Sequence, residues 1–273
     1  MTNLPTITLN NDVEMPLLGL GVYAPQRNSE VRQAVEAALA LGCRLIDTAS
    51  IYGNEREVAD ALAASNVPRN EVFITTKVWN DDQGYERTLR AFDQSLEKLK
   101  IDVVDLYLIH WPDGPDRLGT WRALEAIYHE GRARAIGVSN FYPHHLDELL
   151  EIATVTPAVN QIEFSPYCYR PDVLYYYRAK GIQVEGYAPL VRGLKNDDPR
   201  LMAIAEKYGK STYQVLVRWS MQHGVVTIPK SVKEDRIREN FDVLDFELSA
   251  DDFALLNTVY DNTRIAPDPS DIA

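Results

Sequence analysis

Short apolar runs alternate with longer segments of helical periodicity along almost the whole chain. Each apolar run is followed by a loop and then by a stretch whose apolar residues recur three or four positions apart, which is typical of βα units. The predicted strands are Leu18–Gly21, Leu45–Asp47, Phe73–Lys77, Val104–His110, Ala135–Ser139, Val159–Glu163, Gln183–Tyr187 and Val225–Ile228. The predicted helices are Glu30–Leu41, Glu55–Ala64, Tyr85–Leu99, Thr120–Glu130, His144–Ile152, Pro171–Lys180, Pro199–Tyr208 with Thr212–His223, and Lys233–Phe241.

This alternation predicts an α/β fold, a (β/α)8 TIM barrel. Before the first run, polar and apolar residues alternate on both sides of Asn10-Asn11-Asp12, which indicates an N-terminal β-hairpin. A doubly wound fold is less favoured, because Gly19 and Gly21 lead into Val22 and no Gly-x-Gly-x-x-Gly follows a strand. With 273 residues we expect one barrel domain over residues 1–273.

Composition narrows the classes of partner. The net charge of −12 argues against nucleic acid or an anionic membrane surface, because both favour basic proteins. Two cysteines, Cys43 and Cys168, are too few for a disulfide framework. Residues 1–21 show no basic segment followed by an apolar one, and no apolar run reaches about 18 residues. We therefore expect a soluble, cytoplasmic monomer with no metal site and a small-molecule substrate.

Polar side chains stand where the predicted strands end. In a TIM barrel the carboxyl ends of the strands meet at one mouth, so these side chains are expected to share a site. They are Asp47, Lys77, His110, Ser139, Asn140, Gln161, Glu163, Tyr187 and Lys230.

The first of these residues suit carbonyl chemistry. Asp47 and Lys77 end neighbouring strands, where a buried acid and a buried base are expected to pair. An ammonium beside the phenol of Tyr52 would lower the tyrosine pKa from about 10, and His110 could hydrogen-bond a substrate carbonyl. Such a site supplies a proton but no electrons, so a reduction also needs a hydride donor.

A basic cluster near the C-terminus suits a phosphorylated ligand. Lys230, Ser231 and Arg236 flank the start of the last predicted barrel helix, where free N–H groups and the helix dipole favour phosphate.

Seven motifs, in order, make the chain resemble the aldo-keto reductases over nearly its whole length. They are Gly42-Cys43-Arg44-Leu45-Ile46-Asp47-Thr48-Ala49, Tyr52-Gly53-Asn54-Glu55, Thr75-Thr76-Lys77-Val78-Trp79, Asp105-Leu106-Tyr107-Leu108-Ile109-His110-Trp111-Pro112, Gly137-Val138-Ser139-Asn140-Phe141, Asn160-Gln161-Ile162-Glu163-Phe164-Ser165-Pro166-Tyr167 and Ile228-Pro229-Lys230-Ser231. The short loops are similar to those of compact bacterial and protozoan members, which include 2,5-diketogluconate reductases and general aldehyde reductases. The resemblance implies NADPH-dependent reduction of aldehydes or ketones, with a catalytic tetrad of Asp47, Tyr52, Lys77 and His110 and with Tyr52 as proton donor.

The resemblance also implies a set of cofactor-binding residues. Ser139, Asn140 and Gln161 would hold the nicotinamide carboxamide of NADPH or NADP+, and Tyr187 would stack on its ring. Lys230, Ser231 and Arg236 would bind the adenosine 2′-phosphate, and Glu239 and Asn240 would contact the adenine. Leu190 and Val232 complete the cofactor-binding set. Ala188 replaces a serine that many relatives direct at the pyrophosphate.

Three aromatic residues on the loops of the mouth, Tyr23, Trp79 and Trp111, are expected to line the substrate pocket.

Two rival interpretations of the function remain open. Lys77 could form a Schiff base in a cofactor-free class I aldolase. Alternatively, the barrel could retain its cofactor pocket for binding only, as a non-enzymatic auxiliary subunit.

Overall fold

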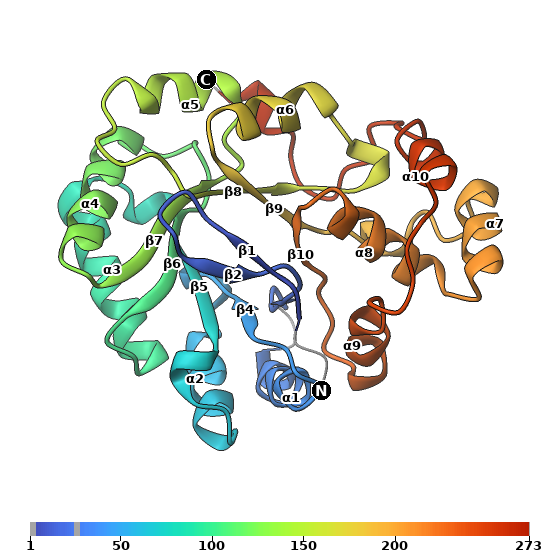
Figure 1. The fold of residues 1–273 in the computed structure, drawn as a ribbon. Helices are drawn as coiled ribbons and strands as arrows, with labels where there is room; N and C mark the ends of the chain where they lie inside the picture. The colour runs from blue at the N-terminus through green and yellow to red at the C-terminus, as the bar shows by residue number, and fades with distance from the viewer. Residues whose placement is uncertain (1–3, 25–27, 273) are drawn as a thin grey trace.

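Eight parallel strands form the centre of the protein in a computed structural model that describes residues 4–24 and 28–272 (Figure 1). Their order in the sheet, β10-β9-β8-β7-β6-β5-β4-β3, follows the chain. The two edges meet through bridges from Leu18 to Thr227 and from Gly21 to Lys230, with Gly19 N donating to the Thr227 carbonyl at 2.9 Å. The sheet therefore closes into a barrel, and the predicted fold class is confirmed.

The strands of the barrel are β3 (Leu20–Gly21), β4 (Leu45–Asp47), β5 (Phe73–Val78), β6 (Val104–Ile109), β7 (Ala133–Ser139), β8 (Val159–Glu163), β9 (Gln183–Tyr187) and β10 (Val226–Ile228). The helices around it are α1 (Asn28–Ala40), α2 (Glu55–Ala64), α3 (Tyr85–Leu99), α4 (Arg117–His129), α5 (Pro143–Leu150), α6 (Pro171–Ala179), α7 (Pro199–Tyr208), α8 (Thr212–Gln222), α9 (Glu234–Phe241) and α10 (Ala250–Leu256). Successive strand residues point alternately inward and outward, so one face of each strand packs inside the barrel and the other packs against the helices.

The barrel interior is filled with apolar side chains below the mouth. Leu45, Phe73, Leu106 and Val159 belong to this inner cluster, and Leu9 and Met15 of the N-terminal hairpin join it. The predicted hairpin is confirmed as β1 (Thr6–Thr8) paired with β2 (Glu14–Pro16). Because Asn10 Nδ2 and Asn11 Nδ2 donate to the Pro157 and Arg134 carbonyls near the starts of β8 and β7, the hairpin covers the end opposite the mouth.

Element boundaries differ from the predictions in a few places. Helix α4 begins three residues before the predicted Thr120, because the Asp116 side chain caps it by accepting from Gly119 N at 2.8 Å. Helix α10 was not predicted. Among the described residues, we find no helix that is both long and apolar enough to cross a bilayer. That residues 1–273 form one domain stays a prediction.

Candidate active site

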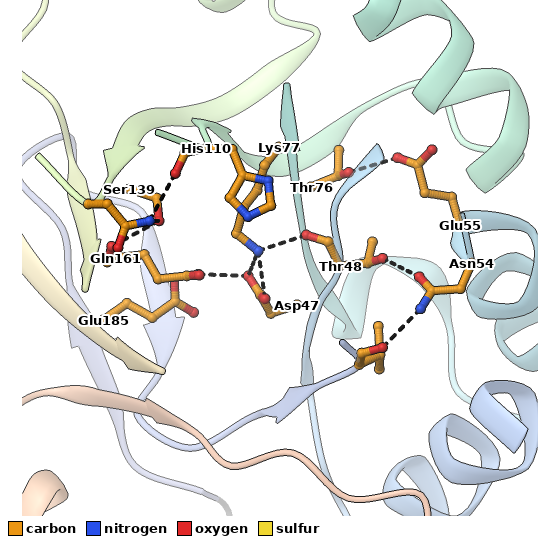
Figure 2. A network of polar contacts seen from close by, with 12 residues as sticks. Asp47, Thr48, Asn54, Glu55, Thr76, Lys77, His110, Ser139, Gln161 and Glu185 are labelled. Atoms are coloured by element: carbon orange, nitrogen blue, oxygen red, sulfur yellow. Dashed lines mark hydrogen bonds and ion pairs between the residues drawn. The ribbon is translucent and has the colours of Figure 1, made fainter. Parts of the chain in front are cut away.

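A buried ion pair lies at the mouth of the barrel. Lys77 Nζ lies 2.7 Å from Asp47 Oδ1 and 2.8 Å from Oδ2, and it also donates to the Thr48 carbonyl at 2.8 Å (Figure 2). Strands β4 and β5 pair with Asp47 opposite Thr75, so Lys77 lies two residues further along on the same face. Burial raises the pKa of Asp47 while Lys77 and a hydrogen bond from Gln161 oppose that rise. With both oxygens on the ammonium, the carboxylate stays ionised.

A buried asparagine fixes the loop that carries Tyr52. Asn54 Oδ1 accepts from the Thr48 hydroxyl at 2.6 Å, and Asn54 Nδ2 donates to the Val22 carbonyl at 2.9 Å (Figure 2). Asn54 occupies the N-cap position of α2, but its side chain makes no capping hydrogen bond there. Gly53, at a φ of 66°, adopts the left-handed conformation that ends the short helix Ser50–Tyr52. Both residues therefore shape the turn after Tyr52.

The Tyr52 ring lies among charged and aromatic groups. Its centroid is 5.2 Å from Lys77 Nζ, 4.9 Å from the Tyr23 ring and 5.5 Å from the His110 ring. The expectation that the Tyr52 pKa lies below its usual value is wrong, because other effects outweigh the Lys77 charge. Burial raises this pKa well above its usual range, and the charges of Asp47, Tyr23 and Glu185 act in the same direction. The Asp47 carboxylate offsets the Lys77 charge, so Tyr52 is a neutral phenol.

His110 is buried at the end of β6 and is neutral. Burial lowers its pKa well below the usual range, and the Lys77 charge adds to that effect. The Trp79 ring stands edge-on to the imidazole with centroids 5.1 Å apart. Within the described part of the chain, His110 Nδ1 has no hydrogen-bond partner. A neutral imidazole can donate one N–H to a carbonyl oxygen.

The four residues predicted to hold the nicotinamide, Ser139, Asn140, Gln161 and Tyr187, are linked to one another by hydrogen bonds. The Ser139 hydroxyl donates to the Gln161 backbone carbonyl at 2.9 Å, and Tyr187 OH donates to Asn140 Oδ1 at 2.8 Å. Asn140 Nδ2 donates to the His110 carbonyl at 3.0 Å, which ties this group to the proposed tetrad. Asn140 takes a φ of 63°, a left-handed conformation that asparagine tolerates better than most residues.

The Gln161 side chain crosses the barrel between two acids. Its Nε2 donates to Asp47 Oδ2 and to Glu185 Oε2, both at 2.8 Å (Figure 2). Glu185 is not among the predicted site residues, because it lies inside a predicted strand and not at its end. Its position two residues before Tyr187 was the available signal, since both must then face the barrel interior. Glu163, in contrast, accepts from Ile265 N and Ala266 N and anchors the C-terminal segment.

The predicted phosphate-binding residues lie at the same end of the barrel. Lys230 pairs with Gly21 of β3, next to the strand that carries Asp47. At the start of α9, Lys233 Nζ is 3.5 Å from Glu30 Oε2 and Arg238 is bonded to Glu234 at 3.1 Å.

Arg236 differs from these paired cations. Its side chain is exposed and, within residues 4–24 and 28–272, makes no hydrogen bond or ion pair. Ser231 Oγ accepts from Lys233 N at 3.1 Å, which shapes the turn before the helix. The other predicted residues of this group are partly or fully buried: Leu190, Val232, Glu239 and Asn240.

The predicted pocket aromatics are only partly brought together. Tyr23 and Trp79 contact the Tyr52 and His110 rings. Trp111 follows His110 and is partly buried, and its carbonyl accepts from Gln83 Nε2 at 2.8 Å. Over the described ranges, its ring has no aromatic contact with the others.

Comparison with known proteins gives consistent matches. The family model "Aldo/keto reductase family" matches residues 17–261. Glyoxal reductase of Bacillus subtilis (strain 168) is 51% identical over 267 residues, which cover 98% of this chain and 97% of that protein. The 9,11-endoperoxide prostaglandin H2 reductase of Trypanosoma cruzi (strain CL Brener) is 47% identical over 98% of this chain and 95% of that protein.

Solved structures agree with the sequence matches. An aldo-keto reductase from a Medee basin deep-sea metagenome library is 44% identical, with a TM-score of 0.94 over 98% of this chain and 100% of that chain. The Bombyx mori aldo-keto reductase in complex with NADP is 36% identical, with a TM-score of 0.91 over 98% of this chain and 96% of that chain.

Proposed function

Because this chain belongs to the aldo/keto reductase family, we propose that it reduces small aldehydes and α-dicarbonyl compounds to alcohols with NADPH. The observation that carries this proposal is the neutral Tyr52 phenol beside both the Lys77–Asp47 ion pair and the neutral His110 imidazole. These groups can donate a hydrogen bond and then a proton to one oxygen atom.

The donor set at the mouth suits a nicotinamide. Both Nε2 hydrogens of Gln161 go to acids, and no described residue donates to its amide oxygen, which can accept from a carboxamide N–H. The Tyr187 ring is partly exposed beside it and offers a stacking surface. Arg236 offers a guanidinium to a 2′-phosphate, which NADPH has and NADH lacks. These features support NADPH, held by Ser139, Asn140, Gln161, Tyr187 and the group around Arg236.

The reduction needs a hydride and a proton. A reduced nicotinamide bound at the mouth would supply the hydride to the carbonyl carbon. His110 orients the carbonyl oxygen by donating an N–H to it, and Tyr52 gives its proton to that oxygen as negative charge develops there. The Lys77 ammonium then stabilises the phenolate that remains, and Asp47 keeps the lysine charged and in position. Tyr52 is therefore the proton donor in this proposal.

The substrate class follows from the pocket walls and from the relatives. Tyr23 and Trp79 flank Tyr52 and His110 with flat apolar surfaces, which suits small planar carbonyl compounds. The similar Bacillus subtilis protein is a glyoxal reductase. The aldolase alternative has less support, because Lys77 is fully buried and its ammonium is bound to three oxygen atoms, whereas a Schiff base requires a free amine.

The direct test follows NADPH absorbance with glyoxal, methylglyoxal, simple aldehydes, keto acids and open-chain sugars. We expect NADPH oxidation with the small aldehydes and dicarbonyls, and slower oxidation with NADH. NADPH binding without reduction of any carbonyl compound would favour the auxiliary-subunit alternative. Borohydride trapping on Lys77 without NADPH oxidation would favour the aldolase.

A further inference from the structure

Glu185 is a fully buried acid that has no role in the proposed reaction. It lies in the interior of β9, directly opposite Gln161 of β8, and its side chain has no exposed surface. Gln161 Nε2 donates to its Oε2 at 2.8 Å, while its Oε1 has no hydrogen-bond partner among the described residues. A buried polar atom without a partner is uncommon and calls for an explanation.

The charges around Glu185 indicate its protonation state. Asp47 accepts from the same amide nitrogen, so the two acids lie on either side of one N–H₂ group. Lys77 is the nearby cation, and its ammonium is bound to Asp47 and to the Thr48 carbonyl. An ionised Glu185 would therefore be a second buried anion with no cation of its own, which is unfavourable.

The titration of Glu185 agrees with this geometry. Burial raises the pKa of Glu185 to about 8, and the Asp47 charge adds to the rise. The hydrogen bond from Gln161 and the Lys77 charge act in the opposite direction and are weaker. The groups that face Glu185 are thus Asp47 of β4, Lys77 of β5, Gln161 of β8 and the Tyr52 phenol, whose pKa its charge raises.

We propose that Glu185 is a positioning residue of this reductase: as a neutral carboxylic acid, it holds the Gln161 amide with its oxygen toward the mouth and leaves the Lys77 charge to Asp47. The inference rests on the proposed function, because the fixed amide oxygen serves the nicotinamide carboxamide. If Glu185 loses its proton, a second anion faces Lys77 and Tyr52. The phenol then becomes a weaker acid, and reduction slows.

The first test compares the pH profile of single-turnover carbonyl reduction in the wild type, E185Q and E185L. Glutamine cannot ionise but can still accept from Gln161, whereas leucine cannot accept. We expect the wild-type rate to fall above about pH 8 and the E185Q rate to persist at least about one pH unit higher. At about pH 6, we expect E185L to react about tenfold more slowly than the wild type, whereas E185Q keeps most of the wild-type rate. The control is Glu125→Gln, which removes the carboxyl group of another buried acid, on α4. We expect it to keep the wild-type pH profile.

The second test needs no substrate. Infrared difference spectra between wild type and E185Q should show the C=O stretch of a protonated carboxyl at about pH 6, and this band should disappear through about pH 8. Fluorescence titration of E185L should show weaker binding of NADPH but unchanged binding of 2′-phospho-ADP-ribose, which has no nicotinamide.

The outcomes separate this inference from the function it rests on. An active wild type whose alkaline decline is unchanged in E185Q, or a spectrum without the protonated band, would overturn the role of Glu185 alone. If the wild type fails to oxidise NADPH with every carbonyl compound tested, the proposed function is overturned, and the role of Glu185 with it. Because E185Q preserves the size of the side chain and one acceptor, the test remains decisive if E185L does not fold.

Discussion

Lys77 donates to both carboxylate oxygens of Asp47, at 2.7 and 2.8 Å, in a position where the lysine side chain has no exposed surface. If either residue formed a different ion pair, the other would remain as an unpaired buried charge. The pair is therefore a single unit in both folding and chemistry.

The first prediction concerns that unit. Asp47→Asn or Lys77→Met alone should destabilise the fold by about 3–5 kcal/mol, because each leaves an uncompensated buried charge. The double variant should be more stable than the sum of the two changes predicts, as a double-mutant cycle measured by urea unfolding would reveal. The exposed pair Lys100–Asp60, at 2.8 Å, is the control and should show no measurable coupling. Additive effects at Asp47 and Lys77 would contradict the account.

The second prediction concerns the cofactor phosphate. Arg236→Ala should weaken NADPH binding by about 10- to 100-fold and NADH binding by less than about threefold, because the lost ion pair is to the 2′-phosphate. Arg238→Ala is the matched control: it removes a cation from the same helix, but one that is paired with Glu234. Fluorescence titration with both nucleotides measures the effect. Equal weakening of NADPH and NADH would refute the assignment of Arg236.

The third prediction concerns the turn that carries Tyr52. Asn54→Ala removes two buried hydrogen bonds and leaves the Thr48 hydroxyl and the Val22 carbonyl without their partner, so it should cost about 2–4 kcal/mol. It should also lower kcat, because the phenol loses its fixed position. Asn70→Ala, at an exposed position, should change stability by less than about 0.5 kcal/mol. If kcat is unchanged in Asn54→Ala, this turn does not position Tyr52.

The fourth prediction is a pH dependence of stability. The pKa of Glu185 is about 8 in the folded protein and near 4.5 when unfolded, so the folded state binds this proton more tightly. The resulting stabilisation is fully present below about pH 4 and is lost as pH rises through about 8. Relative to Glu185→Gln, the wild-type free energy of unfolding should therefore fall by on the order of 1 kcal/mol per pH unit between about pH 5 and 8. Urea unfolding across this range measures it, and parallel curves would contradict it.

The barrel and the ion pair could be predicted from sequence because both follow from local patterns. Eight apolar runs separated by helical segments specify the strand order, and an acid and a lysine at the ends of adjacent strands must lie together. The pairing of Asp47 with Lys77 needed no further information.

Other features of the site depend on groups far apart in the chain. Glu185 was missed because an acid in mid-strand gives no sign of which side chain it meets, and Gln161 reaches it from the neighbouring strand. The predicted direction of the Tyr52 pKa shift was wrong, because burial and the charges of Asp47 and Glu185 raise this pKa by more than the Lys77 charge lowers it. The role of Asn54 could not be predicted from its neighbours, because its partner Val22 is 32 residues away in the sequence.

The central claim is that Tyr52 gives the proton to the carbonyl oxygen. The most direct measurement compares Tyr52→Phe with wild type in two ways, by the single-turnover rate of NADPH oxidation with glyoxal and by the NADPH dissociation constant from fluorescence titration. The account predicts that the rate falls by at least about 100-fold, because general acid catalysis is lost, while the dissociation constant changes by less than about threefold. A Tyr52→Phe variant that reduces glyoxal at the wild-type rate would contradict the claim.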